Sequence, residues 1–212
     1  MTAPNASRLR GAERPGSVED GFVFYVEGAR DRDLLRAWAY RLSPALERVL
    51  EHASVILGGR QPARAVEHFR AFRDAAGEVR GLCVLDRDVD AAPAPQSEVG
   101  LEFYTWGRRH IESYLLVPAA IRRALHLAPD DPRFERILRH QLPATNDETA
   151  LREVNAKRLL GAAGSLSHTL GRSLPLGRIA RAMLRTELHP DILALFERVR
   201  SGLQALGAPK GV

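Results

Sequence analysis

The sequence predicts an α/β protein with a largely parallel sheet, helices on both of its faces, and an α-helical extension towards the C-terminus. Short apolar runs alternate with segments of helical spacing in the first half of the chain, an order typical of parallel sheets. From about residue 119 the strand pattern stops. We therefore divide the chain into a flexible lead-in over 1–20, an α/β domain over 21–118 and a helical extension over 119–212 packed on it.

Four apolar, β-branched or aromatic runs are interpreted as strands. Each is short enough for a strand and is bounded by glycine, proline or charged residues, as buried strands of parallel sheets are. They cover residues 22–28, 53–59, 79–88 and 101–106.

Segments with helical spacing separate these strands. The apolar residues of 31–42 lie on one helical face, and Asp31 stands at the helix start, where the helix dipole favours an anion. A second helix is expected over 62–76, and a short one over 108–118 that Pro118 ends or interrupts. Five further helical segments make up the extension, at 121–127, 134–142, 150–163, 179–188 and 190–206.

Composition excludes several classes of protein. The chain is 45% hydrophobic and 27% charged, which is the balance of a globular protein rather than a disordered one. No run approaches the roughly 18 consecutive apolar residues of a membrane helix, so no membrane association is expected. Cys83 is the only cysteine, which excludes an internal disulfide and fits a reducing, cytoplasmic setting. The net charge of +5 permits binding to a polyanion such as DNA.

Acidic residues follow two of the predicted strands. Glu27 ends the first strand, and Asp86 and Asp88 end the third. Ligands of open parallel sheets bind at the carboxyl ends of the strands, so the three carboxylates converge if these strands are neighbours. Carboxylates so close together need a cation, and hard oxygen ligands suit Mg²⁺ or Mn²⁺. Any one of these acids alone is better interpreted as a solvated loop residue, whereas the three together favour a metal site.

The order of these motifs resembles a known family. VEGARD at 26–31, followed about sixty residues later by LDRD at 85–88, resembles the topoisomerase–primase (Toprim) domain. TWGRRHIESYLL at 105–116 is similar to a segment in the Toprim domains of overcoming-lysogenization-defect nucleases. The likeness continues weakly through 155–160 and 188–199. It implies a Toprim, Rossmann-like fold and metal-dependent cleavage of DNA.

The resemblance also implies roles for individual residues. Glu27 would be a metal ligand or general acid/base, and Asp86 and Asp88 would be the metal-binding pair. Asp31 and Glu112 match two further acids of that branch. Two bound ions would need about four or five carboxylates, which this set supplies. Glu112 is equally well interpreted as a helix-face acid paired with Arg108 four residues earlier.

Three basic residues complete the expected site. Lys157, one of only two lysines, is the candidate for the family's catalytic lysine, although an ordinary surface lysine is the simpler interpretation. Arg108 and Arg109 either contact nucleic-acid phosphates or form a solvated basic face. His110 has no second histidine at helical spacing and is interpreted as a packing or surface residue.

These expectations lead to two alternative functions. The first is a DNA nuclease using two Mg²⁺ or Mn²⁺ ions, acting in phage defence or DNA repair. The chain lacks the glycine-rich ATP-binding loop of the family it resembles. Either the ATPase is a separate chain, or this is a stand-alone Toprim protein, or the sequence is a fragment of a longer one. The second is a non-catalytic Toprim-like module that binds nucleic acid or a partner ATPase. A small-molecule phosphate enzyme is a weaker third interpretation. The sequence is compatible with a homodimer.

Overall fold

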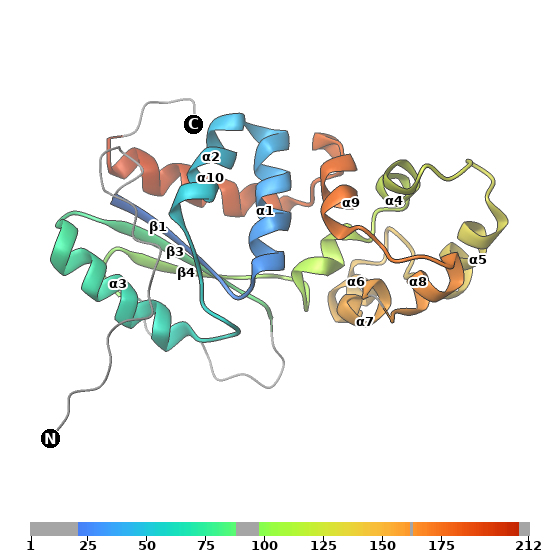
Figure 1. The fold of residues 1–212 in the computed structure, drawn as a ribbon, viewed down its shortest axis with the longest axis horizontal. Coiled ribbons are helices and arrows are strands. Elements are labelled where there is room, and N and C mark those ends of the chain that lie inside the picture. The colour runs from blue at the N-terminus through green and yellow to red at the C-terminus, as the bar shows by residue number, and fades with distance from the viewer. Residues whose placement is uncertain (1–20, 88–97, 162, 208–212) are drawn as a thin grey trace, which may run out of the picture.

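A computed structural model describes residues 21–87, 98–161 and 163–207 (Figure 1). The predicted lead-in over 1–20 and the predicted metal ligand Asp88 lie outside these described residues. In chain order the elements are β1 (Phe22–Val26), α1 (Ala29–Leu42), α2 (Pro44–Ala53), β2 (Ser54–Ile56), α3 (Pro62–Ala76), β3 (Arg80–Leu85), β4 (Leu101–Thr105), the 3-10 helix η2 (Ile111–Leu115), α4 (Pro118–Leu125), α5 (Pro132–His140), α6 (Glu148–Glu153), α7 (Ala156–Leu160), α8 (Ser165–Leu170), α9 (Leu176–Ala182), the 3-10 helix η3 (Arg185–Glu187) and α10 (Pro190–Ala205).

The four strands form one parallel sheet in the order β2-β1-β3-β4. β1 lies between β2 and β3, and its Tyr25 is in register with Val55 on one side and Cys83 on the other. Successive side chains of a strand point to opposite faces. Phe24 of β1 accordingly joins one hydrophobic cluster, while Tyr25 joins the other. The predicted α/β fold with a parallel sheet is confirmed.

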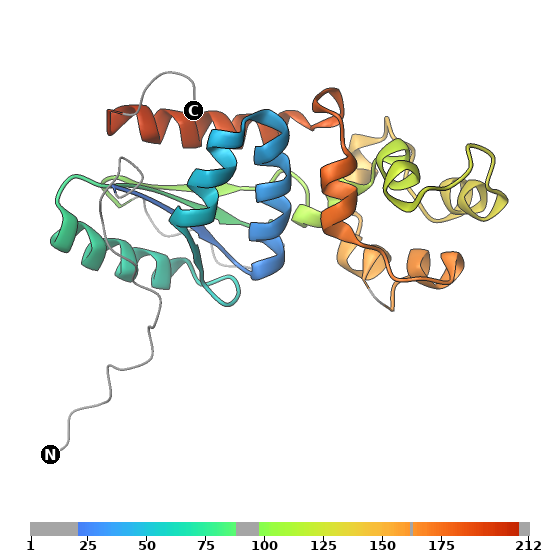
Figure 2. The same ribbon diagram turned by 45° about the horizontal axis from the view of Figure 1, so that its top comes forward.

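Helices cover both faces of the sheet. Figure 2 shows α3 on one face, and α1, α2 and α10 on the other. Phe69 of α3 packs beneath the sheet with Tyr25, and Trp38 of α1 belongs to the larger cluster on the opposite face. The sequence predicts a helical extension over 119–212 that packs on the α/β domain. In the structure, α10 of this segment lies on the α1 face of the sheet, where its Phe196 and Val199 join the core cluster.

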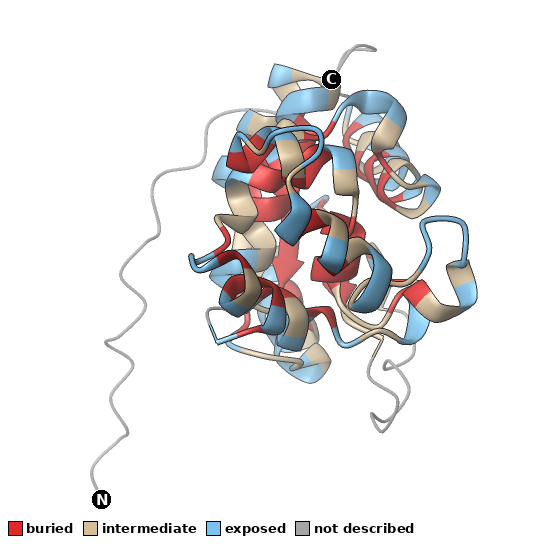
Figure 3. Cartoon of the chain, turned by 90° about the vertical axis from the view of Figure 1, so that its right-hand side faces the viewer, coloured by how far each residue is buried: buried red, intermediate tan, exposed pale blue. Residues whose placement is uncertain are grey.

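The remaining helices, α4 to α9, form a lobe at one end of the sheet (Figure 1). The hydrophobic core runs into this lobe without a break, since Ile121 and Ile179 belong to the same cluster as the α1 residues. The indole nitrogen of Trp38 donates a hydrogen bond to Sδ of Met183, at 3.2 Å. Viewed from the lobe end, buried residues run through the middle of the molecule, with exposed residues around them (Figure 3). No helix among the described residues is long and apolar enough to cross a membrane.

Several elements differ from the sequence-based expectations. The predicted helix over 108–118 is a loop followed by the short 3-10 helix η2, and Pro118 begins α4 instead of ending a helix. Proline suits the first position of a helix, because its missing N–H has no partner there. The predicted segment 150–163 breaks into α6 and α7, where the side chain of Asn155 caps the second helix by accepting from Arg158 N at 3.0 Å. Helices α2 and α8 were not predicted.

Candidate active site

Two acidic residues meet at the carboxyl-terminal edge of the sheet. Glu27 follows β1 and Asp86 follows β3, and these strands are direct neighbours. The backbone N–H of Asp86 donates to Oε1 of Glu27 at 2.8 Å. The structure thus brings together this pair of acids from the first and third predicted strands.

Several other groups at this edge contact Asp86. Its Oδ1 accepts from the backbone N–H of Ile111 at 3.0 Å, and its Oδ2 lies 2.5 Å from Nζ of Lys157. Nδ1 of His110 lies 3.4 Å from the same Oδ2, and the Asp86 carbonyl accepts from Arg60 at 2.8 Å. The Asp86 side chain is only 12% exposed, so these contacts largely replace water around it.

Glu112 and Asp31 bring two more carboxylates to this region. Glu112, on η2, is 1% exposed; its Oε1 lies 3.5 Å from Nη1 of Arg30, while its buried Oε2 has no hydrogen-bond partner among the described residues. Asp31 accepts from the backbone N–H of Gly28 at 2.8 Å, which fixes the start of α1. A buried carboxylate oxygen without a donor is costly, because the lost hydration is not replaced.

Two acids of the site have raised pKa values, and burial is the largest cause of both. Burial, followed by the charges of Asp86 and Glu112, raises the pKa of Asp31 to about 7 against the hydrogen bond from Gly28. Burial also raises the pKa of Glu27, although the hydrogen bond from the Asp86 N–H opposes it. An added cation at this edge would reverse both effects.

Lys157 supplies one positive charge from the helical lobe. Burial disfavours its charged form, but the hydrogen bond and charge of Asp86 outweigh burial, so the pKa of Lys157 is raised. Two contacts hold the preceding helix at the sheet edge: Nη2 of Arg87 and the backbone N–H of Arg109 both donate to the Arg152 carbonyl, at 3.0 and 2.9 Å. The lysine is thus placed by a docked helix rather than by a flexible loop.

Arg108 is buried and contacts neighbouring groups of the protein. It is 6% exposed, and its guanidinium donates two hydrogen bonds to Glu148, at 3.2 and 2.7 Å, and a third to the Ser113 carbonyl at 2.9 Å. The guanidinium also lies over the ring of Tyr114. Arg108 therefore joins η2 to α6, and its buried guanidinium contacts these groups of the protein. Glu148 also replaces Glu112 as its acidic partner, which corrects the alternative pairing considered from the sequence.

Two residues that lie beside Asp86 were not placed there by the sequence. His110 faces Asp86 rather than solvent, and burial, followed by the charge of Lys157, lowers its pKa, which favours a neutral imidazole. Arg60 follows Gly58 and Gly59, whose positive φ angles of 82° and 122° turn the chain after β2. A glycine pair and an arginine directly after a strand of the same sheet were the available signal for Arg60.

The donor atoms fit a hard divalent cation in kind, though not as a preformed cage. Carboxylate oxygens are the ligands that Mg²⁺ and Mn²⁺ prefer, and the unpartnered oxygen of Glu112 is such an atom. Within 21–87, 98–161 and 163–207, no group of three or more histidine, cysteine, aspartate or glutamate residues is arranged to hold a metal ion. Asp88, the further acid expected here, lies outside the described residues.

No family model, curated protein or solved structure matches the chain.

Proposed function

We propose that this protein is a metal-dependent nuclease of the Toprim type that hydrolyses DNA phosphodiesters. One observation carries the proposal: Glu27 and Asp86 follow adjacent parallel strands and are joined by a 2.8 Å hydrogen bond, with Lys157 on Asp86. Ligands of open parallel sheets bind at this edge. Paired acids can hold the metal ions that assist phosphodiester cleavage, and an ammonium can stabilise the charge that develops on the phosphoryl oxygens.

The carboxylates would hold Mg²⁺ or Mn²⁺ at the sheet edge. Glu27 and Asp86 are the central ligands in this proposal, Asp31 and Glu112 are further ligands, and Asp88 follows two residues after Asp86. Two bound ions would supply an activated water and neutralise the leaving oxygen. Burial is the main cause of the raised pKa values of Glu27 and Asp31, and the charge of Asp86 adds to it. A cation bound beside them would favour their charged forms, which supports the proposal.

Cations of the chain itself would bind the substrate phosphate. Lys157 is 44% exposed, so a phosphate oxygen can reach its ammonium while Asp86 orients it from the other side. A fixed ammonium stabilises negative charge that develops on phosphoryl oxygens. Arg60 and Arg109 stand at the same edge, and both lack a carboxylate partner among the residues described. They would attract the DNA backbone through its charge.

A non-catalytic module that binds nucleic acid or a separate ATPase chain is the second candidate. It is favoured by the saturation of Asp86, whose two carboxylate oxygens are already engaged by Ile111 and Lys157. An ammonium permanently seated on Oδ2 would replace a metal ion structurally. In this alternative the acids stabilise the docking of the helical lobe and cut nothing. A role in phage defence or DNA repair is compatible with either candidate.

Nicking of supercoiled plasmid separates the two candidates. The purified chain is assayed with Mg²⁺, Mn²⁺ or EDTA, beside Asp86→Asn and Glu27→Gln variants that keep the shape of the side chains. Asp33→Asn is the matched control, because Asp33 is an exposed α1 acid that pairs only locally with Arg32 at 3.0 Å. The nuclease proposal expects metal-dependent nicking that both site variants lose and the control keeps. Nicking that survives in EDTA or in Asp86→Asn would contradict it, and DNA binding without nicking would favour the second candidate.

A further inference from the structure

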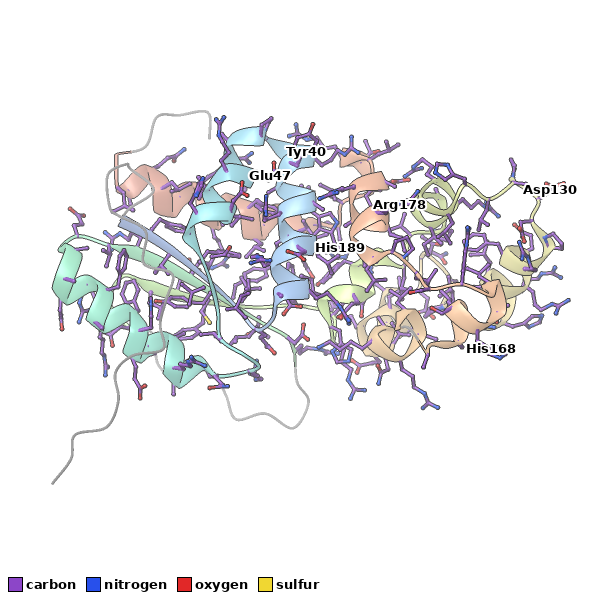
Figure 4. All side chains as sticks on the ribbon, in the orientation of Figure 1. Tyr40, Glu47, Asp130, His168, Arg178 and His189 are labelled. Atoms are coloured by element: carbon purple, nitrogen blue, oxygen red, sulfur yellow. The ribbon has the colours of Figure 1, made fainter. Side chains whose placement is uncertain are left out.

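A groove of about 960 Å³ lies in the helical lobe, on α7. Its walls come from the end of α5 with His140 and Gln141, from α7 with Arg158 and Leu159, and from α8 with His168. Figure 4 shows His168 on α8, at the side of the lobe away from α4 and α9. The volume is at the upper end of the range for ligand sites, which is roughly 300–1,000 Å³, so the groove has room for more than a single small anion.

The charge of the lobe favours an anionic ligand in this groove. Residues 118–188 contain twelve arginines and lysines against seven aspartates and glutamates, a surplus of five that equals the net charge of the entire chain. In the part of the chain that the structure describes, no carboxylate lines the groove. Arg158 is exposed, and no acid of the described residues forms an ion pair with it. A cation that lines a groove without counter-charge attracts phosphates.

The other lining residues suit nucleobases. Leu142 and Leu159 offer apolar surface, and the imidazoles of His140 and His168 can stack on a base. Beside them, Nε2 of Gln141 donates to the Thr169 hydroxyl at 2.9 Å and so connects the end of α5 to α8. The bases of a duplex are stacked on one another, so side chains that stack on a base favour a single strand.

The groove and the site at the sheet edge both use side chains of α7. Arg158 directly follows Lys157 in α7, and the two side chains serve different surfaces: Lys157 contacts Asp86, whereas Arg158 lines the groove. The Asn155 cap fixes the start of this helix and so relates the two residues rigidly. We propose that the groove binds a single-stranded nucleic-acid segment that continues from the scissile phosphate at Lys157. This proposal rests on the proposed function for the position of the scissile phosphate, while the groove's affinity for a single strand does not depend on cleavage.

Binding is measured by fluorescence anisotropy in EDTA, so that no cleavage occurs. The probe is a labelled single strand of about 12 nucleotides, a length within the usual site sizes of single-strand-binding folds, compared with the duplex of the same sequence. Arg158→Glu tests the groove, and Arg185→Glu is the matched control, because Arg185 is exposed in the same lobe but outside the groove. We expect Arg158→Glu to weaken binding at least about tenfold and Arg185→Glu by no more than about threefold, since only the first removes a direct phosphate contact. His168→Ala should weaken binding of the single strand and leave the thermal unfolding temperature unchanged.

Several results would overturn the proposal. Equal weakening by the two arginine variants would show that only the overall charge of the lobe attracts nucleic acid. A duplex that binds as tightly as the single strand would contradict the base contacts. If thymidine monophosphate competes at the same concentration as the unlabelled strand, the groove binds a single nucleotide and not a strand. Plasmid nicking by the same preparation keeps the two proposals apart. If the protein nicks plasmid but Arg158→Glu does not change its affinity for the single strand, only the groove proposal is rejected. If Arg158→Glu weakens binding but the protein does not nick plasmid, only the nuclease proposal is rejected.

Discussion

Nζ of Lys157 lies 2.5 Å from Oδ2 of Asp86, although 71 residues separate them in the chain. This ion pair joins the helical lobe to the carboxyl-terminal edge of the sheet. In the proposed function, a metal ion would bind the same oxygen that the ammonium now contacts. Lys157 and a divalent cation are therefore expected to compete for Asp86, and this competition can be measured.

Replacing Lys157 with glutamine should separate metal binding from cleavage. The variant removes the competing ammonium, so its affinity for Mn²⁺ should equal or exceed that of the unaltered protein. Plasmid nicking should nevertheless fall by at least about 100-fold, because a fixed donor to the phosphoryl oxygens is lost. Electron paramagnetic resonance of free Mn²⁺ measures the affinity. Arg152→Gln, which removes a nearby exposed cation of α6, should change neither quantity, and a clear loss of Mn²⁺ affinity in Lys157→Gln would contradict the competition.

Asp31 should make the metal-free protein less stable as the pH rises. Its pKa is about 7 in the folded protein and close to 4 in the unfolded chain, so the folded state binds more protons between these values. The free energy of unfolding therefore falls as the pH rises from about 4 to about 7, and levels off above that. Asp31→Asn, which can still accept from the Gly28 N–H, should lose this slope and gain about 1–3 kcal/mol at pH 8.

Urea unfolding in EDTA at pH 5 and pH 8 tests the effect of Asp31. Asp33→Asn is the control in the same helix, since Asp33 is exposed and pairs with Arg32, and it should retain the slope of the unaltered protein. Adding Mg²⁺ at pH 8 should stabilise the unaltered protein if the site binds the ion. An Asp31→Asn variant that is less stable than the unaltered protein at pH 8 would show that the carboxylate is already compensated.

The parts of the site that follow from local sequence were predictable. Apolar runs with a terminal acid identify β1 and β3, and a parallel sheet brings Glu27 and Asp86 to one edge. Local sequence places Asp31 at the start of the next helix, whereas its role at the site was implied by the family resemblance. These inferences need only the periodicity of each segment and one assumption about neighbouring strands.

Contacts between the sheet and the lobe were not predictable in this way. Glu148, the partner of Arg108, lies 40 residues away in a helix whose docking no local pattern reveals. The same reason hid the position of His110, which depends on the loop before η2. The pattern of α10 showed an amphipathic helix but not which surface it covers. Lys157 was suggested by the family resemblance and by the rarity of lysine in this chain, whereas its partner Asp86 is set by tertiary packing.

Arg108 should contribute to stability through its pair with Glu148. Replacing it with methionine removes the two hydrogen bonds to Glu148 and one to the Ser113 carbonyl, and should cost about 2–3 kcal/mol, because the guanidinium is buried while Glu148 is partly exposed. Arg152→Met removes the exposed cation on the same Glu148, which lies 3.6 Å away, and should cost less than about 0.5 kcal/mol. Urea unfolding of both variants and of Glu148→Gln completes the comparison. Equal costs for the two arginines would contradict the structural role of Arg108.

Gly202 should be required for α10 to pack on the sheet. A Cβ added at Gly202 would stand 2.6 Å from Cε2 of Phe22, a buried ring of β1. Alanine favours a helix by about 1 kcal/mol over glycine, but overpacking costs about 1–3 kcal/mol, so Gly202→Ala should destabilise by about 1 kcal/mol. Gly177→Ala is the control in α9, since its added Cβ meets nothing within 4 Å, and it should be neutral or slightly stabilising. Adding Phe22→Leu to Gly202→Ala should cost less than the sum of the single changes, because the smaller side chain makes room for the methyl group. If the changes in the free energy of unfolding are strictly additive, α10 is not in close contact with Phe22 of β1 at this position.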